Sequence, residues 1–280
     1  MKRILITLVV VFSTTLIFSQ TVKPSGRIIL TKGQKITVQS NISLEASLTG
    51  MDLTSTSATE NALEVKQSDD KYSTVSNTIT KLKVDMNMMG QATSYDSEKK
   101  EVPGTDIEKA FAEKLNKPVN IIIDNTGTPE AEKQKEKKDE AGDAAPVDGM
   151  LNMFADNSDA AVVSGAFELI PQDKKIGDSW TDSTISKEIK TVRTYTLSSI
   201  TGSEALIQLA AVTNAVNKIE LQGMEIEFKS ETKTTGEIIT DILTGLVKKK
   251  TTQANITGSF QLMGQEMPMS AKANSTNIYK

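Results

Sequence analysis

Four short segments of this chain share one pattern, in which an alternating apolar run meets a glycine and then continues in the opposite phase. The glycines are Gly50, Gly90, Gly223 and Gly264. Before Gly90, the apolar residues of VDMNM hold even-numbered positions, and after it the apolar residues of TSY hold odd-numbered positions. A straight strand cannot change phase and keep one face apolar, because successive side chains point to opposite faces.

Two local structures explain this change of phase. In a two-residue hairpin, the sequence positions of facing residues differ by an odd number, so an apolar face passes from even to odd positions at the turn. A β-bulge in one long strand changes the phase as well. We favour hairpins with glycine as the first central residue of a type II′ turn. The predicted cross-strand pairs are then Leu48–Leu53, Met86–Tyr95, Leu221–Ile226, Ile219–Phe228, Leu262–Met267 and Phe260–Met269.

The spacing of the glycines indicates an internal duplication. Gly50 and Gly90 are 40 residues apart, and Gly223 and Gly264 are 41 residues apart. Each half also opens with a related strand, KGQKITVQS in the first and KIGDSWTDS in the second, and the second half contains one additional hairpin, TYTLSSITGSEALIQLAAV. We therefore predict a mainly β protein with a large curved antiparallel sheet, a half-barrel or barrel, made of two pseudo-repeats.

A helix is predicted at residues 105–116. Thr105 and Glu108 form the capping-box pattern that begins a helix. One face of this helix is apolar, with Ile107, Ala110, Phe111 and Leu115. We expect one or two helices on the concave side of the sheet or across one of its ends.

The N-terminus has the pattern of a signal peptide at residues 1–20. Lys2 and Arg3 precede an apolar run that ends near Phe18, too short for an ordinary membrane span, although a membrane anchor is the alternative. The chain has no Cys, which excludes a lipoprotein signal and disulfides. We expect an exported, soluble protein, periplasmic or extracellular, with no transmembrane anchor after signal cleavage.

The remaining chain divides into a β half at 21–128, a charged linker with a short helix at 129–165, and a second β half at 166–280. Residues 130–146 are almost devoid of apolar side chains and indicate a solvated linker or an exposed charged helix. The segment 147–157 that follows predicts a short amphipathic helix, lying over a groove or plugging one end of the core. Its apolar residues are Met150, Leu151, Met153 and Phe154.

Methionines gather around the four glycines. Of 11 Met, eight lie at or near them. Met is flexible and suits surfaces that accept varied apolar ligands, but it also fills gaps in ordinary cores, and a thioether copper site is a third alternative. The candidate ligand-binding residues are Met86, Met88, Met224, Ile226, Phe260, Met267 and Met269.

The composition argues against most kinds of catalysis. The chain has no His and no Cys, and it contains no nucleophile elbow, phosphate loop or metal-ligand spacing. Its formal charge of −4 argues against a nucleic-acid partner. We expect no enzyme activity, no catalytic residue, no metal and no cofactor.

Three stretches carry a resemblance to known proteins: MNMMGQATSYDSE, KIGDSWTDS and GEIITDILTGLVKK. They resemble an uncharacterised family of exported Bacteroidota proteins, a domain of unknown function, which implies no activity. The expected architecture is similar to the half-barrels of periplasmic lipoprotein carriers. We therefore expect an envelope protein that binds a lipid, acyl chain or lipoprotein segment on a Met-rich concave face. The alternative is a structural or protein-interaction module with an envelope protein partner and no small-molecule site.

Overall fold

The computed structural model describes residues 23–48, 51–88, 90–99, 104–130, 158–186, 188–221, 224–262 and 265–280. The predicted signal peptide at 1–20 and the predicted amphipathic helix at 147–157 lie outside these residues. The charged segment lies outside them too, except for Glu130. Among the described residues, no helix is long and apolar enough to cross a membrane.

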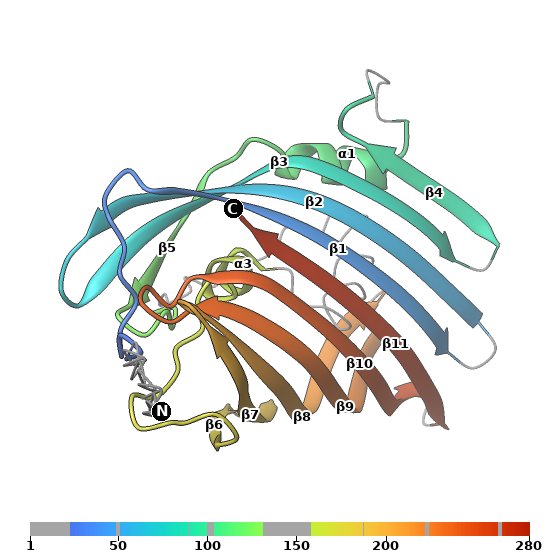
Figure 1. Ribbon diagram of the computed structural model, residues 1–280. Coiled ribbons are helices and arrows are strands. Elements are labelled where there is room, and N and C mark those ends of the chain that lie inside the picture. Colours follow the sequence, from blue (N-terminus) through green and yellow to red (C-terminus); the bar gives the residue numbers. More distant parts are fainter. Residues whose placement is uncertain are drawn as a thin grey trace, which may run out of the picture.

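Eleven strands in the described part of the chain form one antiparallel sheet, which confirms the predicted fold class. The sheet is curved and open (Figure 1), with the strand order β4-β3-β2-β1-β11-β10-β9-β8-β7-β6, and β5 pairs with the outer edge of β3 beside β4. The strands are β1 (Lys35–Leu48), β2 (Met51–Ser68), β3 (Tyr72–Met88), β4 (Gln91–Asp96), β5 (Val119–Asp124), β6 (Ser179–Ile185), β7 (Ile189–Thr201), β8 (Glu204–Leu221), β9 (Met224–Asp241), β10 (Val247–Leu262) and β11 (Gln265–Tyr279).

The last strand joins the two halves of the chain. β11 pairs with β1 from Val38 opposite Tyr279 to Leu48 opposite Met269, and Figure 1 shows this red strand beside the blue one. The side-chain amide of Asn274 also donates a hydrogen bond there to the hydroxyl of Ser43, which lies 231 positions earlier in the sequence. The N-terminal and C-terminal strands therefore share one continuous sheet.

All four glycine motifs lie at two-residue hairpins, as predicted. The strands close with Leu48 opposite Met51, Met88 opposite Gln91, Leu221 opposite Met224 and Leu262 opposite Gln265. The predicted pairs are wrong, because each closing pair places the turn one residue earlier than predicted, which makes Gly90 the second central residue of its turn and not the first. Leu53 thus faces Ala46, and Tyr95 faces Val84. Gly90 has a φ of 81°, which fits glycine at that second position.

The concave face carries most of the apolar side chains of the long strands. Along β1 the buried residues alternate, and their partners on β11 are buried too. These residues are Leu44, Ala46, Leu48, Met269, Ala271 and Ala273. Side chains of directly paired residues point to the same face of a sheet. The pairing of neighbouring strands therefore extends this concave face from β3 to β6.

Within the described residues, two helices lie on the concave side, α1 (Asp106–Lys114) and α3 (Asp159–Ser164). Helix α1 begins with the predicted capping box, in which Thr105 accepts from the backbone of Glu108 and the Glu108 carboxylate accepts from that of Thr105. Phe111 of this helix packs against Leu82 and Val84 of β3.

Helix α3, which the sequence patterns did not predict, is attached by a chain of buried amides. Asn61 of β2 donates to the Asn77 side-chain oxygen at 3.0 Å, and Asn77 of β3 donates to the Asp159 carboxylate at 2.6 Å. Both asparagines are 3% exposed or less. Since Asp159 is the first residue of α3, this chain anchors the helix start to the sheet.

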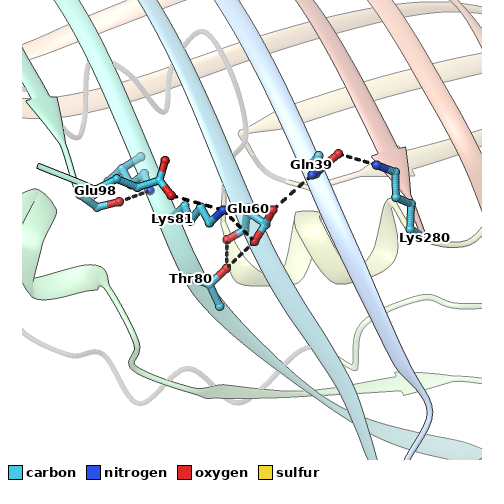
Figure 2. Close-up of polar contacts among 8 residues, drawn as sticks. Gln39, Glu60, Thr80, Lys81, Glu98 and Lys280 are labelled. Carbon is cyan, nitrogen blue, oxygen red and sulfur yellow. Dashed lines mark hydrogen bonds and ion pairs between the residues drawn. The ribbon is translucent and has the colours of Figure 1, made fainter.

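The convex face carries polar residues, which Figure 2 shows in front of the strands, with the pale yellow α3 behind them. Lys280 donates to Gln39 at 3.0 Å, and Gln39 donates to the Glu60 carboxylate at 3.2 Å. Lys81 lies 3.8 Å from Glu60 and 3.4 Å from Glu98. This network crosses the seam between the C-terminus and the first strands.

We expect the convex network to contribute little to stability. Glu60→Gln should lower the free energy of unfolding by less than about 1 kcal/mol, because exposed ion pairs are screened by water and salt. Urea denaturation at low and high salt measures this, and the difference should shrink as salt rises. Glu98→Gln is the matched control, since this carboxylate is 69% exposed against 27% for Glu60. A larger loss for Glu98→Gln would contradict the expectation.

Gly258 is required by the close approach of β9 and β10. A Cβ atom at this position would overlap the backbone carbonyl oxygen of Lys229. We expect Gly258→Ala to lower the free energy of unfolding by about 1–3 kcal/mol, because paired strands would have to separate locally. Thermal unfolding measures this. Gly104→Ala is the control, because a Cβ there meets only the Glu108 carboxylate at 3.6 Å, and an equal loss in both variants would refute the argument.

Candidate ligand-binding site

The apolar residues of the concave face form two large clusters. The turn-end cluster lies near the four glycine turns and consists of Leu44, Ala46, Leu48, Leu53, Met86, Phe228, Ile256, Phe260, Met269, Ala271 and Ala273. The α3 cluster lies at the other end of the strands. It combines Val163, Ala166, Phe167 and Ile170 with strand residues that include Val38, Leu197, Ile207 and Ile238.

The structure brings most of the predicted site residues into the turn-end cluster. Met86, Phe260 and Met269 are buried there, with exposed fractions of 5–7%, and Met88 and Met267 pack against them. Phe260 also stacks on Phe228 with ring centroids 5.5 Å apart. Met224 and Ile226 are on β9 opposite Leu221 and Ile219, but their side chains lie outside the described residues. A ligand role for these residues stays a prediction.

A cavity of about 860 Å³ lies between α3 and the middle of the sheet. Its volume falls within the range of about 300–1,000 Å³ that is usual for small-molecule sites. The walls come from both halves of the chain. They include Val38, Phe167 and Trp180 from the α3 cluster or packed against it, Ala254 and Ala273 at the turn-end cluster, and Ile42 of β1. Since Ala254 and Ala273 belong to or pack against the turn-end cluster, the cavity borders it directly.

Charged residues also line this cavity, and they come from four different segments. Arg193 of β7 is paired with Asp182 of β6 at 3.0 Å and donates to Thr184 at 3.0 Å. Lys250 of β10 and Glu168, which follows α3, complete the group. The Glu168 backbone is fixed by Thr240, whose hydroxyl donates to its carbonyl oxygen at 3.0 Å, and by its own N–H bond to Gly245 at 2.8 Å.

Burial shifts the ionisation of Glu168 and Lys250. Burial raises the pKa of the Glu168 carboxyl to about 7, assisted by Asp182 and opposed by Lys250 and Arg193. Burial also lowers the pKa of Lys250, against the attraction of Glu168. Burial raises the pKa of Tyr195, whose ring stacks on Trp180 at 5.4 Å. Titratable groups with such shifts, gathered in a cavity, mark a candidate functional site.

Strand alternation contains a signal for this site that does not depend on any motif. Lys250 shares the even-numbered phase of Ala254, Ile256 and Phe260, so β10 alternation places a lysine on its apolar face. Arg193 has the same signal, since it shares the odd-numbered phase of Tyr195 and Leu197 on β7, whereas Glu168 has none. In the described part of the chain, no group of His, Cys, Asp and Glu has an arrangement that could hold a metal ion.

Several solved structures are similar over most of this chain. One is a structure of lipid–protein interactions in lipovitellin, with 12% identity and a TM-score of 0.47, covering 90% of this chain and 25% of that one. An outer membrane channel from Pseudomonas putida F1 has 8% identity and a TM-score of 0.26, covering 92% of this chain and 100% of the channel. OccK5 from Pseudomonas aeruginosa has 6% identity and a TM-score of 0.23, covering 89% and 98%.

These likenesses establish no shared function, because every TM-score is below 0.5. The chain spans about a quarter of the length of the lipovitellin chain. No curated protein matches it in sequence. A family model does match, over residues 69–247, more than half of the 280 residues, and its description is a family of unknown function, DUF6263. The chain therefore belongs to the DUF6263 family.

Proposed function

We propose that this protein is a non-catalytic binding protein that holds an apolar ligand, a lipid or acyl chain, on the concave face of its sheet. The observation that carries the proposal is the cavity of about 860 Å³ bordered by the turn-end cluster. An open sheet with an apolar concave face offers room for a ligand that a closed core would exclude.

The position of the cavity refines the predicted site. Met86, Phe260 and Met269 are buried side chains of the turn-end cluster, whereas the open volume lies over Ala254, Ala273 and Ile42. A ligand chain in the cavity would reach the cluster across the small side chains of Ala254 and Ala273. Met side chains beside it could adjust to chains of different length, because three rotatable bonds let them repack.

We also propose that the protein is exported and is periplasmic or extracellular. A signal pattern at residues 1–20 supports this location. The proposal also includes the absence of catalysis. The absence of His and of known nucleophile motifs from the sequence supports it. Mass spectrometry of the mature N-terminus and the cell fraction tests the location.

Ala254→Phe tests the site directly. Ala254 is half-buried and lines the cavity opposite Ala273, so a larger side chain would occupy the ligand volume. We expect native mass spectrometry of protein from its host to detect a bound lipid in the wild type and less in the variant. Binding of N-phenyl-1-naphthylamine, a neutral apolar fluorescent probe, should fall by about tenfold or more, since about 1.4 kcal/mol corresponds to tenfold.

Ala92→Phe is the matched control, because Ala92 is exposed on β4 and lies outside the cavity lining. It should bind the probe as the wild type does. Circular dichroism and thermal unfolding would establish that both variants fold. A folded wild type that binds neither the probe nor any lipid from its host would contradict the proposed function.

A further inference from the structure

The cavity contains one cation that the described residues leave without a hydrogen bond or an ion pair. Lys250 is half-buried on β10 and lines the cavity, yet no acceptor among the described residues lies within bonding distance of its ammonium group. Arg193 differs, because Asp182 and Thr184 already accept its hydrogen bonds. A bound anion would supply the hydrogen-bond acceptor that this ammonium group lacks among the described residues.

The residues along β10 form a gradient from polar to apolar. On the concave face they run Lys250, Thr252, Ala254, Ile256, Gly258 and Phe260. Beside Lys250, the ladder places Asn277 of β11 and then Ser40 of β1, both of which line the cavity. The head of an amphiphile would therefore meet polar groups at Lys250, while its tail would point toward the turn-end cluster.

We propose that the cavity binds a single-chain amphiphile with an anionic head group, held between the Lys250 ammonium and the Glu168 carboxyl, with its acyl tail directed along β10 to the turn-end cluster. This inference rests on the proposed function and names its ligand class. The ammonium donates to the anion, and Glu168 donates an O–H bond to it in its protonated form. Asn277 supplies a further side-chain donor for the head group.

Protonation of Glu168 couples this binding to pH. Ionised Glu168 repels an anion, whereas the neutral carboxyl donates to it, and its pKa of about 7 allows both forms near neutrality. The charged groups facing it are Lys250 of β10, Arg193 of β7 and Asp182 of β6, with the Tyr195 hydroxyl of β7 nearby. Binding of an anion should therefore weaken as the pH rises above 7.

The test compares three probes of equal chain length with the full chain: palmitate, hexadecanol and hexadecylamine. The affinity for each probe is measured by its displacement of N-phenyl-1-naphthylamine. The wild type should bind palmitate more tightly than hexadecanol or hexadecylamine. Lys250→Met should weaken palmitate about 10- to 100-fold and leave hexadecanol unchanged, because a charge-assisted hydrogen bond is lost. Lys250→Arg should restore most of the affinity. Lys249→Met is the matched control, since Lys249 is exposed and points to the other face.

The outcomes separate this inference from the proposed function. Binding of hexadecanol and palmitate with equal affinity, unaltered in Lys250→Met, would overturn the anionic head group and leave apolar binding intact. A preference for hexadecylamine would overturn it as well. Binding of none of the three probes would overturn the proposed function itself, and the inference with it.

A second arm measures the pH dependence with hexadecanesulfonate, whose charge is constant between pH 6 and 8. Wild-type affinity should fall about tenfold across this range, since a group with a pKa of about 7 loses its proton there. Glu168→Gln keeps a hydrogen-bond donor and removes the titration of this carboxyl, so its affinity should fall less than that of the wild type between pH 6 and 8. An equal fall in both proteins would overturn the role of Glu168.

Discussion

Replacing Asn77 by alanine is expected to lower the free energy of unfolding by about 3–5 kcal/mol. The side chain is 1% exposed, and it accepts from Asn61 at 3.0 Å and donates to Asp159 at 2.6 Å. Its removal would leave the buried Asn61 amide without this acceptor and the Asp159 carboxylate without this donor. An unsatisfied buried group costs about 1–3 kcal/mol, and a bond to a charged group contributes about 1.5–3 kcal/mol.

The destabilisation caused by Asn77→Ala should also affect the candidate site. Ser158, Ala161, Val162 and Gly165 belong to or flank α3 and line the cavity. Since Asp159 begins this helix, Asn77→Ala should loosen that wall. Hydrogen exchange should increase at the α3 amides before it increases at the β8 and β9 amides, and affinity for N-phenyl-1-naphthylamine should fall.

Asn120→Ala is the matched control for Asn77→Ala. Asn120 is exposed on β5, opposite Ser76 in the same sheet, so its replacement should change stability by less than about 0.5 kcal/mol. Urea denaturation with a common slope measures both variants. A loss below about 1 kcal/mol for Asn77→Ala would show that the amide chain does not hold α3.

Glu168→Gln is expected to make the protein more stable above pH 7 and to leave its stability unchanged near pH 4. Burial raises the pKa of Glu168 from 4.5 to about 7, so the folded state disfavours the ionised carboxylate. The wild type is free of this penalty below pH 4.5, acquires it as the pH rises, and has the full penalty above pH 7. A shift of this size corresponds to at most about 3 kcal/mol.

The difference between the variant and the wild type isolates this carboxyl from the others. Asp124 and Asp241 act in the opposite direction, since turn hydrogen bonds outweigh burial and lower the pKa of both. Both proteins share those contributions, which cancel in the comparison. Urea denaturation at pH 4, 6 and 8 supplies the three points.

Glu113→Gln is the matched control, because Glu113 is exposed on α1. Its free energy of unfolding should match that of the wild type at all three pH values. Parallel curves for the wild type and Glu168→Gln would mean that the Glu168 carboxyl remains solvated. That result would also remove the basis for proton-coupled ligand binding.

The hairpins could be predicted because alternation is local. In a strand, a side chain's face depends only on whether its position is odd or even, so the phase change at Gly90 and its three counterparts is visible in the sequence. The predicted partners were wrong because moving a turn by one residue shifts each partner by two. Leu53 then faces Ala46 and not Leu48, and every side chain keeps its face.

Other features depend on contacts between distant residues. Helix α3 has six residues, and a segment this short is helical mainly because of what it packs against. Its anchor joins Asn77 to a residue 82 positions away. The capping box of α1 was predictable by contrast, because Thr105 and Glu108 are three positions apart and satisfy each other within one turn.

A mainly β protein, hairpins at four glycines and an apolar face along the strands follow from local patterns in the sequence. The open sheet, the pairing of β11 with β1, and the meeting of Lys250, Glu168 and Arg193 in one cavity depend on contacts between distant segments. These two groups of features differ in the sequence distance over which their interactions act. Alternation and capping act within a few residues, whereas the burial that shifts the pKa of Glu168 exists only after distant segments have packed together.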